Sequence, residues 1–407
     1  MSRSAFNVMS VAARPQAGWR RSAPAVPEST TTTPRRSSAA PRSSAGALTA
    51  GPPGSATIAL TLLACTVLAT GCVRGHDRPR DEVRLGYFPN LTHAQALVGL
   101  AHGDFQKAVA PLRLVPRAFN AGPQAMEALF AGELDLCYVG SGPAVNAYVR
   151  SSGRALRVVA GAASGGASLV VRSDSGIRGP EDLARRRIAT PQIGNTQDIA
   201  LRSYLKEHGL APTDKGGSVQ VVASSNPDIL SLMIRRQIDG AWVPEPWATR
   251  LVREAAGRVL VDERGLWPHG RFATTVVVAS QTFLGQQPEV VRRFLGAHVD
   301  VTLWIRDHPA EARAQVNAEL GRLLGKPLPA EVLDDAFSRL EVTYDPLEDS
   351  LLRAAERAFE LGFLGSRRPD VAGLLDPGLL HDVLAERRLE PVTASGGGSH
   401  SDGRHSR

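Results

Sequence analysis

The 407-residue sequence predicts an α/β fold, and three observations support this. Short hydrophobic runs of strand length alternate with segments in which apolar residues recur at helical spacing. Met126, Leu129 and Phe130, for example, fall at i, i+3 and i+4 and form one apolar face, and residues 135–139 then form a short hydrophobic strand. Turns rich in Gly and Pro separate these segments, as at residues 121–123 and 140–143.

Both of these turns lead from the end of a strand into the start of a helix. Pro residues fall early in both helices, where a missing N–H costs nothing. A helix start offers free N–H groups and the positive end of the helix dipole, so it is a ready anion site. Ordinary strand–helix turns of an α/β domain are the alternative. The candidate binding residues of the two turns are Gly122, Pro123, Gly140, Ser141 and Gly142.

Taken in order, the pattern predicts a first group of strands and helices before residue 172. Val83, Leu85 and Tyr87 alternate, which indicates a strand over 82–88, and a helix follows it to about Gly103. A second strand is expected over 112–119, ahead of the two turns described above. Two more strands are expected over 155–160 and 167–172, separated by a Gly/Ser-rich loop over 161–166 that is either part of the site or a structural turn.

A second group of alternating elements follows. A strand is predicted over 187–190, and Leu201, Tyr204 and Leu205 keep helical spacing in a helix that ends at His208, with Gly209 as its C-cap. Strand, helix and strand are then expected over 219–222, 227–236 and 240–243. A hydrophobic strand is expected over 272–279, and residues 289–364 have the spacing of helices.

The charge distribution argues against a nucleic-acid partner. The formal net charge is +7, but residues 1–80 carry +8 and residues 391–407 carry +1, which leaves −2 for residues 81–390. The part of the chain with α/β patterning is therefore not basic, and no stripe of basic and aromatic residues is present in it.

The amino-terminal region predicts export. Residues 1–55 are rich in Ser, Thr, Pro and Arg, and we expect them to be disordered. Residues 56–71 are uncharged and have the length of a signal-peptide core, and the run Leu68-Ala69-Thr70-Gly71-Cys72 resembles a lipoprotein cleavage box. We therefore expect a leader over 1–72, a lipid on Cys72, a tether over 73–81 and a disordered tail over 391–407. A plain secretory signal is the alternative.

The cysteine pattern predicts neither a disulfide framework nor a metal site. Of the three cysteines, Cys65 leaves with the leader, Cys72 carries the lipid, and Cys137 stands alone inside a strand as a small buried residue. No cofactor is expected.

Three ordered stretches resemble the sulfonate, nitrate and taurine family of solute-binding proteins, which serve ABC importers. The first is F-x-A-G-P-Q-x-x-E-A-L-x-x-G-x-x-D-L-x-x-x-G-x-x-P, beginning at Phe119; the others are residues 190–196 and 239–247. The similarity extends from Val83 to about Leu364. It implies a two-lobed fold of the type II periplasmic binding protein kind, with two chain crossings: lobe 1 over 82–171 and, with a helical part, 272–390, and lobe 2 over 172–271.

The resemblance also implies where the ligand binds. The turn after the first strand, the loop before the helix at 196 and the end of the strand at 243 should face one cleft. For His93, an exposed position in a first helical turn is the alternative, and for Trp242 it is a place in the core. The implied ligand residues are Phe88, Asn90, Thr92, His93, Gly194, Asn195, Thr196, Trp242 and Glu245.

The function implied by the resemblance is capture of a small organic anion outside the cytoplasm and its delivery to an ABC permease and its ATPase, without catalysis. An aliphatic sulfonate or taurine is the expected ligand; nitrate, bicarbonate or another oxyanion is the alternative. Relatives on the same fold bind thiamine-pyrimidine precursors or synthesise the pyrimidine. The enzymes need a cysteine-rich run and a reactive histidine, and the single core cysteine argues against this activity.

Overall fold

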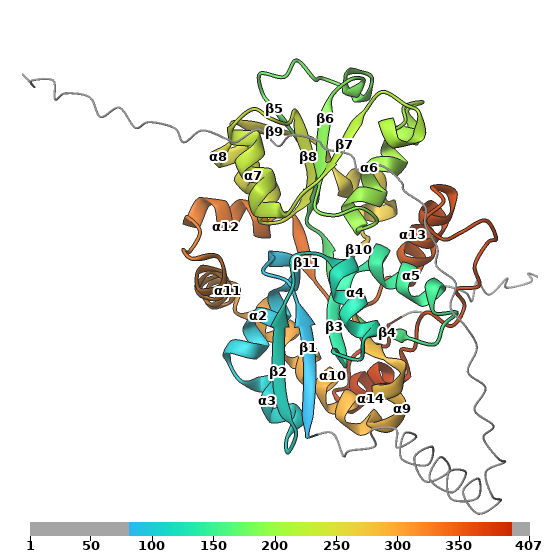
Figure 1. Ribbon diagram of the computed structural model, residues 1–407. Coiled ribbons are helices and arrows are strands. Elements are labelled where there is room, and N and C mark those ends of the chain that lie inside the picture. Colours follow the sequence, from blue (N-terminus) through green and yellow to red (C-terminus); the bar gives the residue numbers. More distant parts are fainter. Residues whose placement is uncertain (1–80, 393–407) are drawn as a thin grey trace, which may run out of the picture. The chain divides into compact units, whose positions relative to one another are not determined.

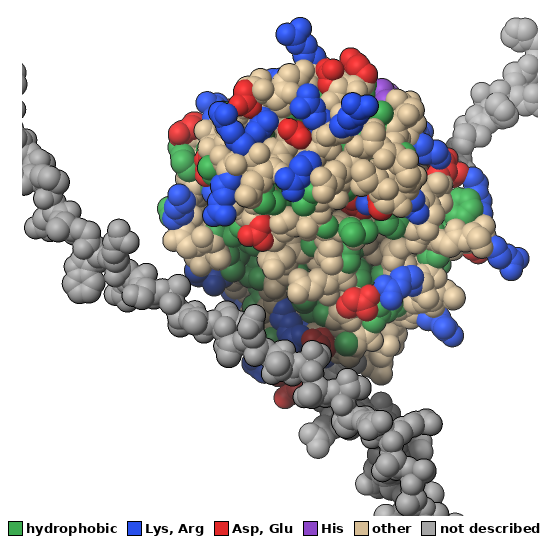
Figure 2. Space-filling view, turned by 45° about the horizontal axis from the view of Figure 1, so that its top comes forward, with side chains coloured by type: hydrophobic (Ala, Val, Ile, Leu, Met, Phe, Trp, Pro, Cys, Tyr) green, Lys and Arg blue, Asp and Glu red, His purple; other side chains and the backbone are tan. Residues whose placement is uncertain are grey.

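The computed structural model describes residues 81–392; the predicted leader, Cys72 with its predicted lipid and most of the predicted tail lie outside this range. Two lobes, each built on its own sheet, make up the described chain (Figure 1). This confirms the predicted two-lobed α/β fold. On the face drawn in Figure 2, Lys and Arg side chains are interspersed with Asp and Glu, and no single-sign patch dominates it.

Lobe 1 is organised around a six-stranded mixed sheet with the order β11-β4-β10-β3-β1-β2. β1 pairs in parallel with β2 and β3, whereas β10 runs antiparallel to both β3 and β4. The strands are β1 (Glu82–Tyr87), β2 (Arg113–Ala118), β3 (Leu136–Gly140), β4 (Leu156–Gly165), β10 (Ala273–Ser280) and β11 (Leu340–Val342).

Helices cover both faces of this sheet because alternate residues of its strands are apolar on opposite sides. In β3, Leu136 and Tyr138 join one core, and Cys137 and Val139 join the other. The first core lies under α2 (Ala94–Ala101), α3 (Asp104–Val109), α10 (Pro288–Asp307), α11 (Pro309–Leu324), α12 (Ala330–Phe337) and α14 (Gly378–Glu386). The second lies under α4 (Gly122–Phe130), α5 (Ser141–Arg150) and α13 (Glu348–Glu360), and α9 (Gln281–Gln286) follows β10.

Lobe 2 has a five-stranded sheet with the order β7-β6-β8-β5-β9. Its strands are β5 (Ala167–Arg172), β6 (Arg187–Thr190), β7 (Gln220–Ala223), β8 (Gly240–Pro244) and β9 (Gly257–Asp262). α6 (Thr196–Glu207) packs on one face, and α7 (Asn226–Ile234) and α8 (Trp247–Glu254) pack on the other.

The first crossing between the lobes lies earlier than expected. β5 belongs to the second sheet, so the chain leaves lobe 1 at Gly166 rather than after residue 171. Gly165 and Gly166 both have positive φ there, a backbone conformation that glycine adopts without strain. The chain returns to lobe 1 between β9 and β10.

The prediction of a loop over residues 161–166 is wrong, because β4 continues to Gly165. Its small residues serve close packing instead: a Cβ on Gly161 would lie 1.8 Å from the backbone oxygen of Asp345. Glycine inside a strand marks such a close backbone approach as often as it marks a turn. The short elements α3, β9, β11 and α14 were not predicted.

Two features are absent from the described part of the chain. Between residues 81 and 392, no helix combines the length and apolar character needed to cross a bilayer. Within the same range, His, Cys, Asp and Glu side chains do not gather in threes in a way that could hold a metal ion.

Candidate functional site

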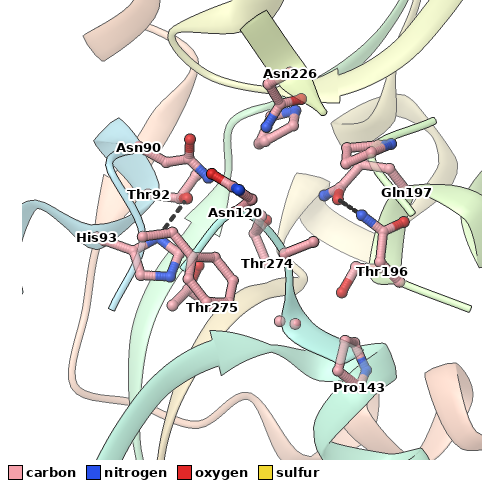
Figure 3. A pocket seen from close by; sticks show the side chains of 17 residues that line it. Asn90, Thr92, His93, Asn120, Pro143, Thr196, Gln197, Asn226, Thr274 and Thr275 are labelled. Atoms are coloured by element: carbon pink, nitrogen blue, oxygen red, sulfur yellow. Dashed lines mark hydrogen bonds between the residues drawn. The ribbon is translucent and has the colours of Figure 1, made fainter. Parts of the chain in front are cut away.

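A cavity lies where the two lobes meet, at the ends of their strands (Figure 3). The space open to the centres of water-sized molecules is about 30 Å³, so the cavity is small in this arrangement of the lobes. Its lining residues are Phe88, Asn90, Thr92, His93, Asn120, Ala121, Gly122, Gly140, Pro143, Thr274 and Thr275 from lobe 1, and Pro191, Asn195, Thr196, Gln197, Asn226 and Pro244 from lobe 2.

The amino ends of four α-helices converge on this cavity. Gly122 begins α4, Gly140 precedes α5, Thr196 begins α6 and Asn226 begins α7, and all four residues line the cavity. Each helix start carries about half a positive charge on its free N–H groups. The arrangement therefore favours an anion at the point where the helices meet.

The lobes touch beside the cavity. The backbone N–H of Gly142 donates to Thr196 Oγ1 across the cleft at 3.2 Å. A Cβ on Gly140 would lie 2.3 Å from the same oxygen, so the approach depends on the absence of a side chain. These glycines thus allow the amino end of α5 in lobe 1 to meet the amino end of α6 in lobe 2.

On the lobe 1 side, the turn after β1 supplies polar groups that are hydrogen-bonded within the protein. Trp247 Nε1 donates to Asn90 Oδ1 at 3.0 Å, and Thr92 Oγ1 lies 3.1 Å from His93 Nδ1. Burial lowers the pKa of His93 to about 3, so its ring is neutral at physiological pH. The Phe88 ring lies against it, with centroids 4.6 Å apart.

On the lobe 2 side, Asn195 is the N-cap of α6. Its Oδ1 accepts from the backbone N–H of Asp198 at 2.8 Å, and its Nδ2 donates to Gln197 Oε1 at 3.2 Å. Asp198 is buried and accepts from Gly194 N and from Arg202 Nε, which holds the start of this helix in place. All polar side chains in the described lining are neutral amides, hydroxyls or the neutral His93.

Eight of the residues predicted from sequence line the cavity together: Phe88, Asn90, Thr92, His93, Gly122, Gly140, Asn195 and Thr196. Three others lie next to it. Pro123 follows Gly122 at the start of α4, and Ser141 and Gly142 line a smaller cavity of about 20 Å³ that shares Thr196 with the first. Gly194, with φ +73°, leads into Asn195.

Contrary to the prediction, Trp242 does not lie over the cleft. Its side chain is fully buried in the core of lobe 2, against Tyr204, and its Nε1 donates to Glu263 Oε2 at 2.7 Å. The physical reason is strand alternation, because Trp242 points toward α6 while Ala241 and Val243 point toward α7 and α8.

Glu245 also lies outside the lining. Its Oε2 accepts from the backbone N–H of Thr249 and so caps α8, and its Oε1 lies 3.7 Å from Arg339. Burial raises the pKa of Glu245 to about 7. Its backbone oxygen accepts from Leu91 N, so this residue ties the end of β8 to the turn after β1.

Nine lining residues were not predicted as site residues: Asn120, Ala121, Pro143, Pro191, Gln197, Asn226, Pro244, Thr274 and Thr275. Asn120 adjoins a predicted turn, Gln197 follows a predicted loop, and Asn226 precedes Pro227 at a helix start, so a wider window around each helix start would have found them. Pro191 lies in a matched stretch. Thr274 and Thr275 lie inside a hydrophobic strand, where the sequence carries no signal for a site.

The fold and cavity define the class of protein: two α/β lobes with a binding cavity between them, as in type II periplasmic binding proteins. The alkanesulfonate-binding protein of Xanthomonas axonopodis pv. citri, solved with MOPS, matches with TM-score 0.61 and 21% identity over 73% of this chain and 98% of its own. The nitrate-binding protein of Synechocystis PCC 6803 matches with TM-score 0.66 and 12% identity over 78% and 92%. These identities establish the fold alone.

The chain belongs to the NMT1-like family, whose model matches residues 76–320. Among curated proteins, it is 31% identical over 184 residues to the taurine-binding periplasmic protein of Escherichia coli (strain K12), covering 45% of this chain and 55% of that protein. Similar proteins of Brucella abortus are 28% identical over 180 residues. The chain thus spans about half the length of the curated relatives it matches.

Proposed function

We propose that this protein is the solute-binding component of an ABC importer and that it binds a small organic anion, most simply an aliphatic sulfonate. The observation that carries the proposal is the convergence of four helix amino ends on a cavity between two lobes. Free N–H groups and neutral side-chain donors stabilise an anion without a fixed counter-ion. Family membership and the taurine-binding relative support the same class of ligand.

Capture rather than chemistry is the proposed role. The described lining holds one ionisable group, His93, and its lowered pKa keeps it neutral, so the cavity has no acid–base pair for catalysis. Ligand binding between the lobes would favour their closed arrangement, and a permease could then recognise that form. The partners proposed are therefore a membrane permease and its ATPase.

An extracytoplasmic location, with a lipid on Cys72, belongs to this proposal. It rests on the uncharged run and cleavage box in the sequence, and on the periplasmic relatives. Cys72 lies outside the described residues.

An alkyl tail distinguishes a sulfonate from a bare oxyanion such as nitrate. The cavity has apolar groups for a tail, since Phe88, Pro143, Pro191 and Pro244 all line it. A buried methylene contributes about 0.8 kcal/mol, or roughly fourfold in affinity.

Titration calorimetry of the full chain with nitrate, sulfate and methane-, ethane- and propanesulfonate tests the proposal. We expect affinity to rise a few-fold per carbon until the cavity is full, and Phe88→Leu to flatten that rise. Binding of nitrate without binding of any sulfonate would replace the sulfonate by an inorganic oxyanion. No binding of any of these anions would refute the anion-binding role.

A further inference from the structure

Three of the five carboxamides that line the cavity use their carbonyl oxygens within the protein. Asn90 Oδ1 accepts from the Trp247 indole at 3.0 Å, and Gln197 Oε1 accepts from Asn195 Nδ2 at 3.2 Å. Asn195 Oδ1 accepts from the backbone N–H of Asp198. An indole N–H and a backbone N–H only donate, so these contacts determine which end of the Asn90 and Asn195 amides is the oxygen. The NH₂ groups of Asn90 and Gln197 remain available to a ligand.

Trp247 is well suited to hold Asn90 in this orientation. It is the first residue of α8, its side chain is buried in the core of lobe 2, and the Arg250 guanidinium lies over its ring at 4.7 Å. These contacts hold the indole with its N–H directed at Asn90 in lobe 1. Next to it, the backbone N–H of Leu91 donates to Glu245 O at 3.1 Å, which fixes the turn that carries Asn90.

We propose that the cavity selects a sulfonate whose tail carries no ammonium group, and that Trp247 is the positioning residue that enforces this selection through Asn90. This inference rests on the proposed sulfonate-binding function. An ammonium group needs acceptors, whereas Asn90 and Gln197 present donors and the helix amino ends present partial positive charge. Asn120 and Asn226 are not held in this way, and the buried Oδ1 of Asn226 has no partner in the described structure.

A pair of ligands of nearly equal size isolates the tail charge. Propane-1-sulfonate and taurine have the same number of heavy atoms and the same sulfonate group, and differ by a methyl in place of an ammonium. For the full chain, calorimetry should give propane-1-sulfonate an affinity at least about tenfold higher than taurine, because the ammonium meets no carboxylate in the described lining and lies near the partial positive charge of the helix amino ends.

Trp247→Phe tests the positioning role. The variant keeps a ring in the lobe 2 core but removes the N–H donor, which frees the Asn90 amide to turn its oxygen toward the cavity. The preference for propane-1-sulfonate over taurine should shrink several-fold. Trp304→Phe, which changes a tryptophan on α10 outside the lining, is the matched control and should leave the preference unchanged.

Asn90→Asp provides a second variant. Its carboxylate still accepts from the Trp247 indole but replaces the free NH₂ group by a negative oxygen, so binding of both sulfonates should fall and propane-1-sulfonate should lose more than taurine. Equal affinities for the two ligands in the unmodified protein, or tighter taurine binding, would overturn the inference while leaving sulfonate binding intact. An equal loss of affinity for both ligands in Trp247→Phe would show that Trp247 acts through packing alone and does not position Asn90. Failure of either sulfonate to bind the unmodified protein would instead overturn the proposed function.

Discussion

A single methyl group at Gly140 should weaken ligand binding by preventing the lobes from meeting. Gly140 has φ −66° and ψ 151°, which alanine adopts freely, and within its own lobe the nearest atom to an added Cβ is Pro143 Cδ at 3.6 Å. Across the cleft, however, the Cβ would lie 2.3 Å from Thr196 Oγ1. Gly140→Ala therefore fits the open protein and collides only in the arrangement with contacting lobes.

The magnitude follows from the contacts that the collision disturbs. Overpacking by one methyl costs about 1–3 kcal/mol, and loss of the Gly142–Thr196 hydrogen bond costs about 1 kcal/mol. A total of about 2–4 kcal/mol weakens binding by roughly thirtyfold to several hundredfold. Calorimetry with the tightest sulfonate measures the change, and thermal unfolding without ligand should shift little.

Two further variants separate this mechanism from a general defect. Gly285→Ala, in α9, adds a methyl with no atom within 4 Å and should bind like the unmodified protein. Combining Gly140→Ala with Thr196→Ala removes the colliding oxygen, and the remaining Thr196 Cβ is 3.4 Å away, so the pair should bind more tightly than Gly140→Ala alone. Unchanged affinity in Gly140→Ala, or no recovery in the pair, would refute the steric account.

Three other outcomes are expected. Asn195→Ala removes the N-cap of α6, so the free protein should lose about 1 kcal/mol of unfolding free energy by denaturation and sulfonate affinity should also fall; full affinity would remove Asn195 from the site. Burial raises the folded pKa of Glu245 from 4.5 to about 7, so the stability it contributes is present below pH 4.5 and is lost as the pH rises through 7. Glu245→Gln should accordingly gain stability over the unmodified protein between pH 5 and 8, by an amount of the order of 3 kcal/mol, in urea unfolding, and a constant difference across this range would contradict the assignment. Cys72→Ser should release the protein from the membrane fraction without loss of sulfonate binding, and a wild-type protein that is soluble with its leader intact would contradict export.

The strand-end turns could be predicted from sequence because their chemistry is local. Gly140 and Asn195 follow short hydrophobic strands and precede apolar helical spacing, and parallel strands bring their carboxyl ends to one edge of a sheet. The rule does not apply to β10, which runs antiparallel to β3 and β4. Thr275 pairs with Gly140, so the amino end of β10 meets the carboxyl end of β3, and two threonines of a hydrophobic strand reach the cavity.

The two tryptophans show where sequence alone could not decide. Trp242 and Trp247 stand five positions apart at the end of one strand. Trp242 falls on the strand face that packs under α6, whereas Trp247 falls past the strand, where α8 begins and directs its N–H at Asn90. The strand face that a residue occupies, and the helix that covers that face, decide whether the residue is buried in the core or reaches the cavity. Which helix covers each face is a property of tertiary packing.

In the proposed site, the head and the tail of the ligand are therefore selected by different features of the structure. In the proposed function, helix amino ends bind the anionic head, and any sequence with these turns provides such ends, so this part of the proposed site follows from the fold. Recognition of the tail depends on which atom of an amide faces inward. For Asn90 that choice is made by Trp247, a residue 157 positions away in the other lobe. A relative with the same asparagine but another residue in place of Trp247 would keep the anion site and lose the constraint on the tail. Ligand range in this family should accordingly follow the partners of the cavity amides more closely than the amides themselves.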